Sequence, residues 1–211
     1  MLASNGAYLL SAYEGFVPWC IPYIDGCTTI SQAGRSGNAI FFFRVSMIIY
    51  CVCLIWFWLY ARHWLDLLHG RATKTSQLIL WLGLAGMLSL IIYIDFLGTE
   101  GEVNRFMRHI GVLFYFTLTP LAQLLMLNQH FRISKETQNT ALSHGILKYQ
   151  LSTLILMLAT GLISISLNLT GNKTTVTENI VEWNFSLLMM MYFSGMIFLW
   201  KHYRQSFTIK K

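Results

Sequence analysis

The sequence predicts an all-α fold: a polytopic transmembrane helix bundle of five full spans plus a short N-terminal half-span, in a single transmembrane domain over residues 1–211. Two observations predict it. Hydrophobic residues make up 55% of the chain and charged residues 11%, whereas ordinary soluble domains carry about 25% charged residues. The apolar residues also gather into runs long enough to cross a bilayer, which leaves no room for a separate soluble domain.

The N-terminal half-span is predicted from a short apolar patch at 7–13, which is too short to cross a membrane. Residues 1–15 contain no basic segment ahead of a full apolar run, so we expect no cleavable signal peptide. The next segment, 18–38, holds two prolines and three glycines. Because backbone that is not helical cannot face lipid, we expect this loop to lie at one membrane face.

The first full span is predicted at 39–60. It contains 22 residues, of which only Arg44 is charged. Such a helix rises by about 1.5 Å per residue and therefore crosses the roughly 30 Å of bilayer hydrocarbon. In the connection that follows, 61–77, Trp64 and its flanking leucines predict a short helix at the membrane interface.

Apolar runs predict the other four spans at 78–97, 110–127, 151–169 and 183–200. The second of the five contains Gly83 and Gly86, small residues that allow neighbouring helices to approach closely. The third contains Pro120, which cannot donate a hydrogen bond to the carbonyl of Phe116, so a kink is expected there. The hydroxyls of Thr117 and Thr119 are the nearest candidates to satisfy that carbonyl.

The distribution of basic residues predicts the orientation. Ten lysines and arginines fall on one set of alternate connections and four on the other. The larger set is expected to face the cytoplasm or its equivalent, which puts the C-terminus there and the 18–38 loop on the opposite side. The larger set is Arg62, Arg71, Lys74, Arg132, Lys135, Lys148, Lys201, Arg204, Lys210 and Lys211, and the smaller set is Arg35, Arg105, Arg108 and Lys173.

Charge and motifs exclude several classes of function. The net charge of +6 comes from basic residues spread over short connections, so we expect no nucleic-acid partner. The histidines lie in or beside these connections and none lies in the middle of a span. The chain contains no C-x-x-C, H-E-x-x-H or G-x-S-x-G motif. We therefore predict no catalytic residue, no metal site and no cofactor.

Five polar residues are predicted to gather at the non-cytoplasmic ends of the helices: Asp25, Arg44, Asp95, His109 and Glu182. Two of them lie within apolar runs, where an ionisable group is costly unless it is paired or faces a watery cavity. One interpretation is a set of structural ion pairs that lock the bundle. The other is a pocket for a lipid headgroup or, less favoured, an acid–base site formed by the histidine and the glutamate.

Four cysteines divide into two pairs. Cys20 and Cys27 flank a turn on the predicted non-cytoplasmic side, where they could form a disulfide if that side is oxidising. Cys51 and Cys53 lie within the first span and are predicted to be buried small hydrophobic residues.

The string P-Y-I-D-G-C-T-T at 22–29 resembles a segment of the DRAM family, within the Frag/DRAM/Sfk-like superfamily. His109 opens the third full span and Glu182-Trp183 opens the last, as a histidine and an E-W pair do in that family. The resemblance implies six spans and a role in autophagy or in lipid remodelling and organisation. The chain departs from the family at Ile30, Ser31 and Gln32, where the family has P-P-E, and at its first helix, which is either lost here or begins before the recorded start.

Two functions of different classes follow. The first is a DRAM-like integral membrane protein that is not an enzyme and that binds or organises membrane lipids. The alternative is a small accessory subunit of a larger membrane complex, in which a partner subunit covers the flank of the 39–60 span left open by the missing helix, with Phe41 to Phe43, Trp56 and Trp58 on it. Enzymatic lipid remodelling is a third, less favoured interpretation.

Overall fold

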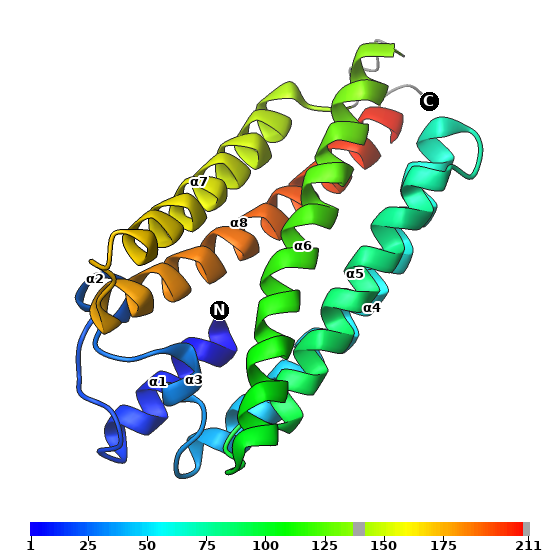
Figure 1. Ribbon diagram of the computed structural model, residues 1–211. Coiled ribbons are helices and arrows are strands. Elements are labelled where there is room, and N and C mark those ends of the chain that lie inside the picture. The colour runs from blue at the N-terminus through cyan, green and yellow to red at the C-terminus, as the bar shows by residue number, and fades with distance from the viewer. Residues whose placement is uncertain (137–141, 209–211) are drawn as a thin grey trace.

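The computed structural model describes residues 1–136 and 142–208, which form helices joined by loops, without a strand (Figure 1). Five helices in this part of the chain, α4 to α8, are long and apolar enough to cross a membrane, which confirms the predicted transmembrane helix bundle. The helices are α1 (Leu2–Tyr13), α2 (Pro22–Asp25), α3 (Ile30–Ala33), α4 (Ala39–His69), α5 (Lys74–Asp95), α6 (Glu102–Glu136), α7 (His144–Leu169) and α8 (Thr175–Thr208).

The long helices extend beyond the predicted spans. α4 continues without a break to His69, so the prediction of a separate interfacial helix in the following connection is wrong. It ends at Gly70, whose φ of 68° lies in the left-handed region that favours glycine. α5 then begins after Thr73, whose hydroxyl accepts a hydrogen bond from the Ser76 backbone N–H over 3.1 Å. Apolar runs mark only the hydrocarbon-crossing part of a helix, whereas the helix itself continues until a residue ends it.

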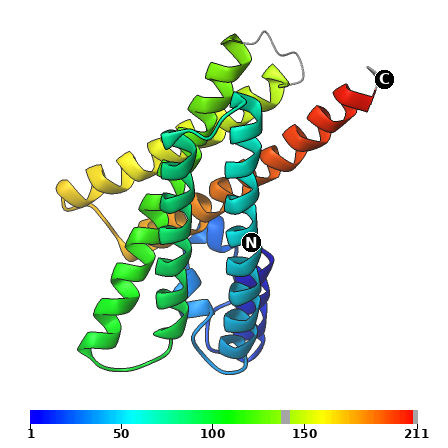
Figure 2. The same cartoon turned by 90° about the vertical axis from the view of Figure 1, so that its right-hand side faces the viewer.

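The five long helices form two groups (Figures 1 and 2). α4, α5 and α6 pack along one another, and α7 and α8 form a second pair inclined to them. Within the first group, Gly83 of α5 lies against the indole ring of Trp58, where an added Cβ would collide with the ring. Gly86 makes a similar close approach to Thr119 of α6. Both glycines therefore allow close helix packing, as predicted.

α6 continues as a helix through Pro120. The Thr117 hydroxyl donates to the Leu113 carbonyl over 2.8 Å, and the buried Thr119 hydroxyl has no hydrogen-bond partner among the described residues. Neither hydroxyl bonds to the carbonyl of Phe116, so that expectation is wrong. The kink at Pro120 stays a prediction.

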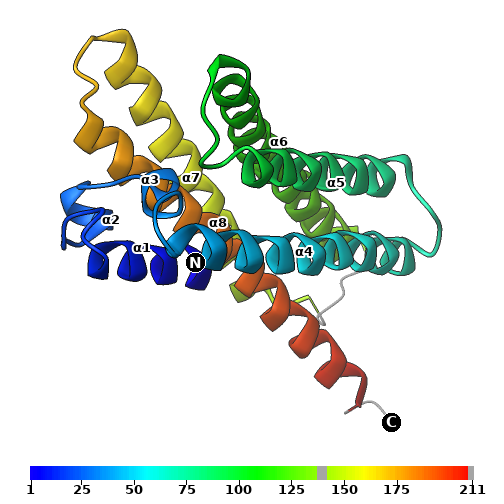
Figure 3. The ribbon, with the colours of Figure 1, turned by 90° about the horizontal axis from the view of Figure 1, so that it is seen from below.

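The short helices α1, α2 and α3 cover one end of the bundle, called here the α1–α3 end (Figure 3). α1 has 12 residues, about 18 Å at 1.5 Å per residue, and is too short to cross a membrane. It packs against α4, whereas α2 packs against α8. Side chains of α8 hold the loop around α2: Asn179 donates to the Gly26 carbonyl over 2.7 Å and Asn184 to the Tyr23 carbonyl over 2.8 Å.

The aromatic flank predicted on the first full span is only partly open. Phe43 and Trp58 are completely buried, because the first lies beside Gly34 and the second packs on Gly83. Phe41 and Trp56 are 68% and 70% exposed. The alternation of buried and exposed aromatics follows the helical period, so one side of α4 faces the bundle and the other faces outward.

Candidate functional site

Two adjoining hollows lie between the two groups of helices, toward the α1–α3 end. The first, of about 550 Å³, is lined by α1, α3, α4, α5, α6 and α8. The second, of about 600 Å³, is lined mainly by α6, α7, α8 and the loop before α8. Four residues line both, Tyr93, Val112, Phe116 and Glu182. These four residues therefore mark the junction of the two spaces.

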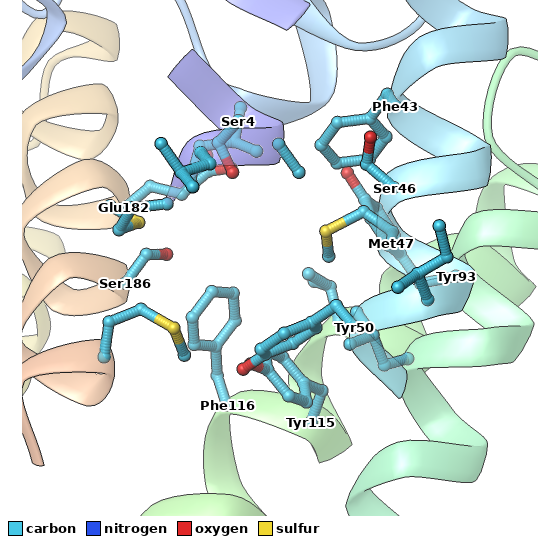
Figure 4. A pocket seen from close by; sticks show the side chains of 18 of the residues that line it. Ser4, Phe43, Ser46, Met47, Tyr50, Tyr93, Tyr115, Phe116, Glu182 and Ser186 are labelled. Atoms are coloured by element: carbon cyan, nitrogen blue, oxygen red, sulfur yellow. The ribbon is translucent and has the colours of Figure 1, made fainter. Parts of the chain in front are cut away.

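The first hollow is mostly apolar, and we call it the apolar hollow. Figure 4 shows Ser46, Met47 and Tyr50 of α4 on one side of it and Glu182 and Ser186 of α8 on the other. The two hydroxyls of Tyr50 and Tyr115 lie 3.0 Å apart and form a hydrogen bond. Burial lowers the pKa of the amino group of Met1, at the start of the chain beside this hollow.

The second hollow carries cationic side chains, and we call it the basic hollow. Arg105, Arg108 and His109 come from the first turns of α6, and Lys173 comes from the α7–α8 loop. Lys173 is paired with Glu178, with Nζ and Oε1 3.1 Å apart. Arg108 donates from Nη1 to the carbonyls of Phe96 and Thr99, each over 3.3 Å. The exposed Arg105 guanidinium has no hydrogen bond or ion pair within residues 1–136 and 142–208.

Glu182 lies at the junction of the two hollows, near the start of α8. The backbone N–H groups of Ile30 and Ser31 interact with its carboxylate, and Tyr93 lies close enough to interact with it electrostatically. In the described part of the chain, no lysine, arginine or histidine forms an ion pair with Glu182. The hollows thus share a carboxylate that interacts with backbone N–H groups and forms no ion pair in the described part of the chain.

The five residues predicted to gather do not form one cluster. Arg44 donates from Nη2 to the backbone carbonyls of Asp95 and Leu97, over 3.1 and 2.5 Å. In the described structure the Arg44 guanidinium therefore forms no ion pair with the Asp95 carboxylate, and its bonds instead hold the C-terminal end of α5. Asp25 accepts a hydrogen bond from the Ile21 backbone N–H over 2.7 Å, beside the short helix α2. Of the five, His109 and Glu182 line the basic hollow, and the other three line neither of the two hollows described above.

Several lining residues were not predicted as part of a site. Arg105, Arg108 and Lys173 were used only to predict the orientation in the membrane. Their spacing contained a signal, because Arg105, Arg108 and His109 are three and four residues apart and share one face of a helix. Tyr93 had no comparable signal, because its place in the junction depends on how α5, α6 and α8 pack.

Cys20 and Cys27 are joined by a disulfide, and their Cα atoms are 6.6 Å apart. The disulfide closes the loop that contains α2. Cys51 is buried, whereas Cys53 is exposed, so the prediction of two buried cysteines in this span is wrong for Cys53. Successive residues of a helix face different directions, and Cys53 lines the apolar hollow.

No group of three or more His, Cys, Asp or Glu side chains in the described ranges could hold a metal ion. Comparison of the chain with protein families, curated proteins and solved structures finds no match.

Proposed function

We propose that this multi-pass membrane protein binds a membrane lipid in the two adjoining hollows, in a DRAM-like, non-enzymatic role in membrane or lipid organisation. The observation that carries the proposal is the junction of an apolar space with a basic one inside a transmembrane bundle. The apolar hollow has a volume of about 550 Å³ and the basic hollow one of about 600 Å³. Both volumes lie within the range of small-molecule binding sites.

The positions of the charges support a lipid rather than a water-soluble ligand. Arg105 lies in the first turn of α6 and Lys173 in the α7–α8 loop, at helix ends, where lipid headgroups meet a membrane protein. Basic pockets between transmembrane helices bind phosphorylated headgroups. The apolar hollow extends from this level along α4, from Phe42 to Cys53, in the direction that the acyl chains of a lipid take.

Binding without a chemical step fits the geometry better than acid–base catalysis. His109 and Glu182 both line the basic hollow, but no hydrogen bond joins them in the described structure. A general acid or base must lie within hydrogen-bond reach of the substrate proton that it transfers. The exposed imidazole of His109 and the backbone-held carboxylate of Glu182 instead present two separate polar contacts to a ligand.

Native mass spectrometry after extraction in a mild detergent tests the proposal. The wild-type protein is expected to retain a phospholipid-sized mass. Ser186→Trp would fill the apolar hollow and is expected to abolish that retention, because Ser186 lines the hollow on α8.

Ser152→Trp is the matched control, because Ser152 is exposed on α7 and lines neither hollow. Retention by the control and loss by Ser186→Trp would support the proposal. Equal lipid retention by all three proteins would contradict binding in the apolar hollow.

A further inference from the structure

We propose, on the basis of the lipid-binding function above, that the hollows select a zwitterionic phospholipid, with its headgroup ammonium at Glu182 and its phosphate at Arg105. The selected chemistry is a phosphate and an ammonium on the same headgroup. The ammonium is primary in phosphatidylethanolamine and quaternary in phosphatidylcholine. Anionic phospholipids that lack an ammonium are disfavoured.

The Glu182 carboxylate lies on a helix of the transmembrane bundle. A carboxylate within a transmembrane bundle is costly unless a cation or hydrogen-bond donors compensate for its lost hydration. The backbone of Ile30 and Ser31 supplies donors, but no cation on the wall of the basic hollow forms an ion pair with Glu182 in the described structure, and two of these cations are engaged elsewhere. Lys173 pairs with Glu178, and Arg108 binds two carbonyls at the end of α5. A ligand ammonium would supply the missing positive charge.

Aromatic side chains line the hollows together with that carboxylate. Tyr93 and Phe116 line both hollows together with Glu182, and Phe185 lines the basic one. The faces of aromatic rings attract ammonium groups, including methylated ones, and this attraction is stronger where water is excluded. A carboxylate beside several rings therefore fits an ammonium group better than it fits a neutral hydroxyl.

Arg105 supplies the guanidinium for the lipid phosphate. Its guanidinium makes no bond in the described structure and lines the basic hollow at the start of α6. A guanidinium can hold two phosphate oxygens through parallel N–H groups. Arg105 and Glu182 thus place opposite charges on the wall of one hollow, which complements the opposite charges of a zwitterionic headgroup.

The Glu182 carboxylate on the same wall disfavours an anionic headgroup. A lipid with a phosphate and no ammonium would leave the charge of Glu182 uncompensated and would approach it with a like charge. We therefore expect selectivity for zwitterionic over anionic phospholipid on the order of tenfold, which corresponds to about 1.4 kcal/mol of binding free energy.

The experiment is a competition measured by native mass spectrometry. Delipidated wild-type protein receives equal amounts of phosphatidylethanolamine, phosphatidylcholine and phosphatidylglycerol with identical acyl chains. Retention of either zwitterionic lipid about tenfold above phosphatidylglycerol is the expected result. Equal retention, or preference for phosphatidylglycerol, would overturn the selectivity while leaving lipid binding intact. Failure to retain any of the three would instead overturn the proposed function as well.

Two variants and a control test which side chain contacts the ammonium of the headgroup and which contacts its phosphate. Glu182→Gln is expected to retain lipid but to lose the preference, and Arg105→Gln is expected to lower the retention of all three lipids. Glu102→Gln is the control, because Glu102 is exposed in the first turn of α6 and lines neither hollow. A preference that survives in Glu182→Gln would remove Glu182 from the headgroup site. The wild-type competition decides the selectivity even if a variant does not fold.

Discussion

The indole N–H of Trp183 donates a hydrogen bond to the backbone carbonyl of Thr28 over 2.9 Å, between residues 155 positions apart in the sequence. Both residues are buried, at 0% and 1% exposure. Tyr8 and Tyr23 pack edge-on against the same indole. Trp183 thus joins α8 to the loop between α2 and α3 and holds the wall on which Glu182 lies.

Trp183→Phe is expected to lower the free energy of unfolding by about 1–3 kcal/mol, because the buried Thr28 carbonyl would lose its donor. Thermal unfolding in detergent measures the effect. Trp81→Phe is the control, since Trp81 is 67% exposed and makes no hydrogen bond in the described structure. An unchanged unfolding temperature for Trp183→Phe would show that this bond does not hold the loop.

Arg44→Ala is expected to destabilise the bundle, because the carbonyls of Asp95 and Leu97 would lose their shared donor. Arg44→Lys is expected to restore only part of the stability, since lysine lacks the planar guanidinium. Arg71→Ala is the control, because Arg71 is exposed in the α4–α5 loop. Equal thermal stability of the wild type and both Arg44 variants would contradict a structural role for Arg44.

The apolar runs were sufficient to predict five spans, because helix length and hydropathy are local properties. They indicated that Arg44 and Asp95 lie at the same end of their helices, where Arg44 binds the Asp95 backbone, but they could not distinguish a carboxylate partner from a backbone carbonyl. The hollows could not be predicted, because they depend on the inclination of α7 and α8 relative to α4, α5 and α6.

Replacing Cys20 and Cys27 together by serine is expected to lower the free energy of unfolding by about 2 kcal/mol, as the disulfide closes a loop of eight residues. Thermal unfolding with and without a reductant measures it. Cys53→Ser, outside the disulfide, is the control. A reductant that lowers the unfolding temperature of the double variant as much as that of the wild type would contradict the disulfide as the cause.

The predicted topology can be tested with reporter fusions after Asn172 and after Lys211, which are expected to report opposite sides of the membrane. Asn172 lies between α7 and α8, and α8 is long and apolar enough to cross. Lys211 and its neighbour Lys210 lie outside the described residues. Because basic residues favour the cytoplasmic side, the C-terminal fusion is expected there. Reporters on the same side would contradict the topology.

His130 is a buried polar side chain whose contribution to stability is expected to come from packing and not from hydrogen bonds. It is completely buried in α6, and neither ring nitrogen has a hydrogen-bond partner among the described residues. Its ring packs edge-on against Trp64, with centroids 4.8 Å apart. An unsatisfied buried polar group costs about 1–3 kcal/mol. His130→Phe keeps an aromatic ring there and is therefore expected to maintain or raise the thermal stability.

His69→Phe provides the contrast, because His69 Nε2 lies 3.1 Å from Gln129 Oε1 and forms a hydrogen bond with it. Its loss is expected to lower the free energy of unfolding by about 1 kcal/mol. The two variants make the same chemical change, histidine to phenylalanine, at sites that differ in hydrogen bonding. If His130→Phe were destabilised more than His69→Phe, the His130 ring nitrogens would have to make stabilising contacts, and the packing interpretation of His130 would be wrong.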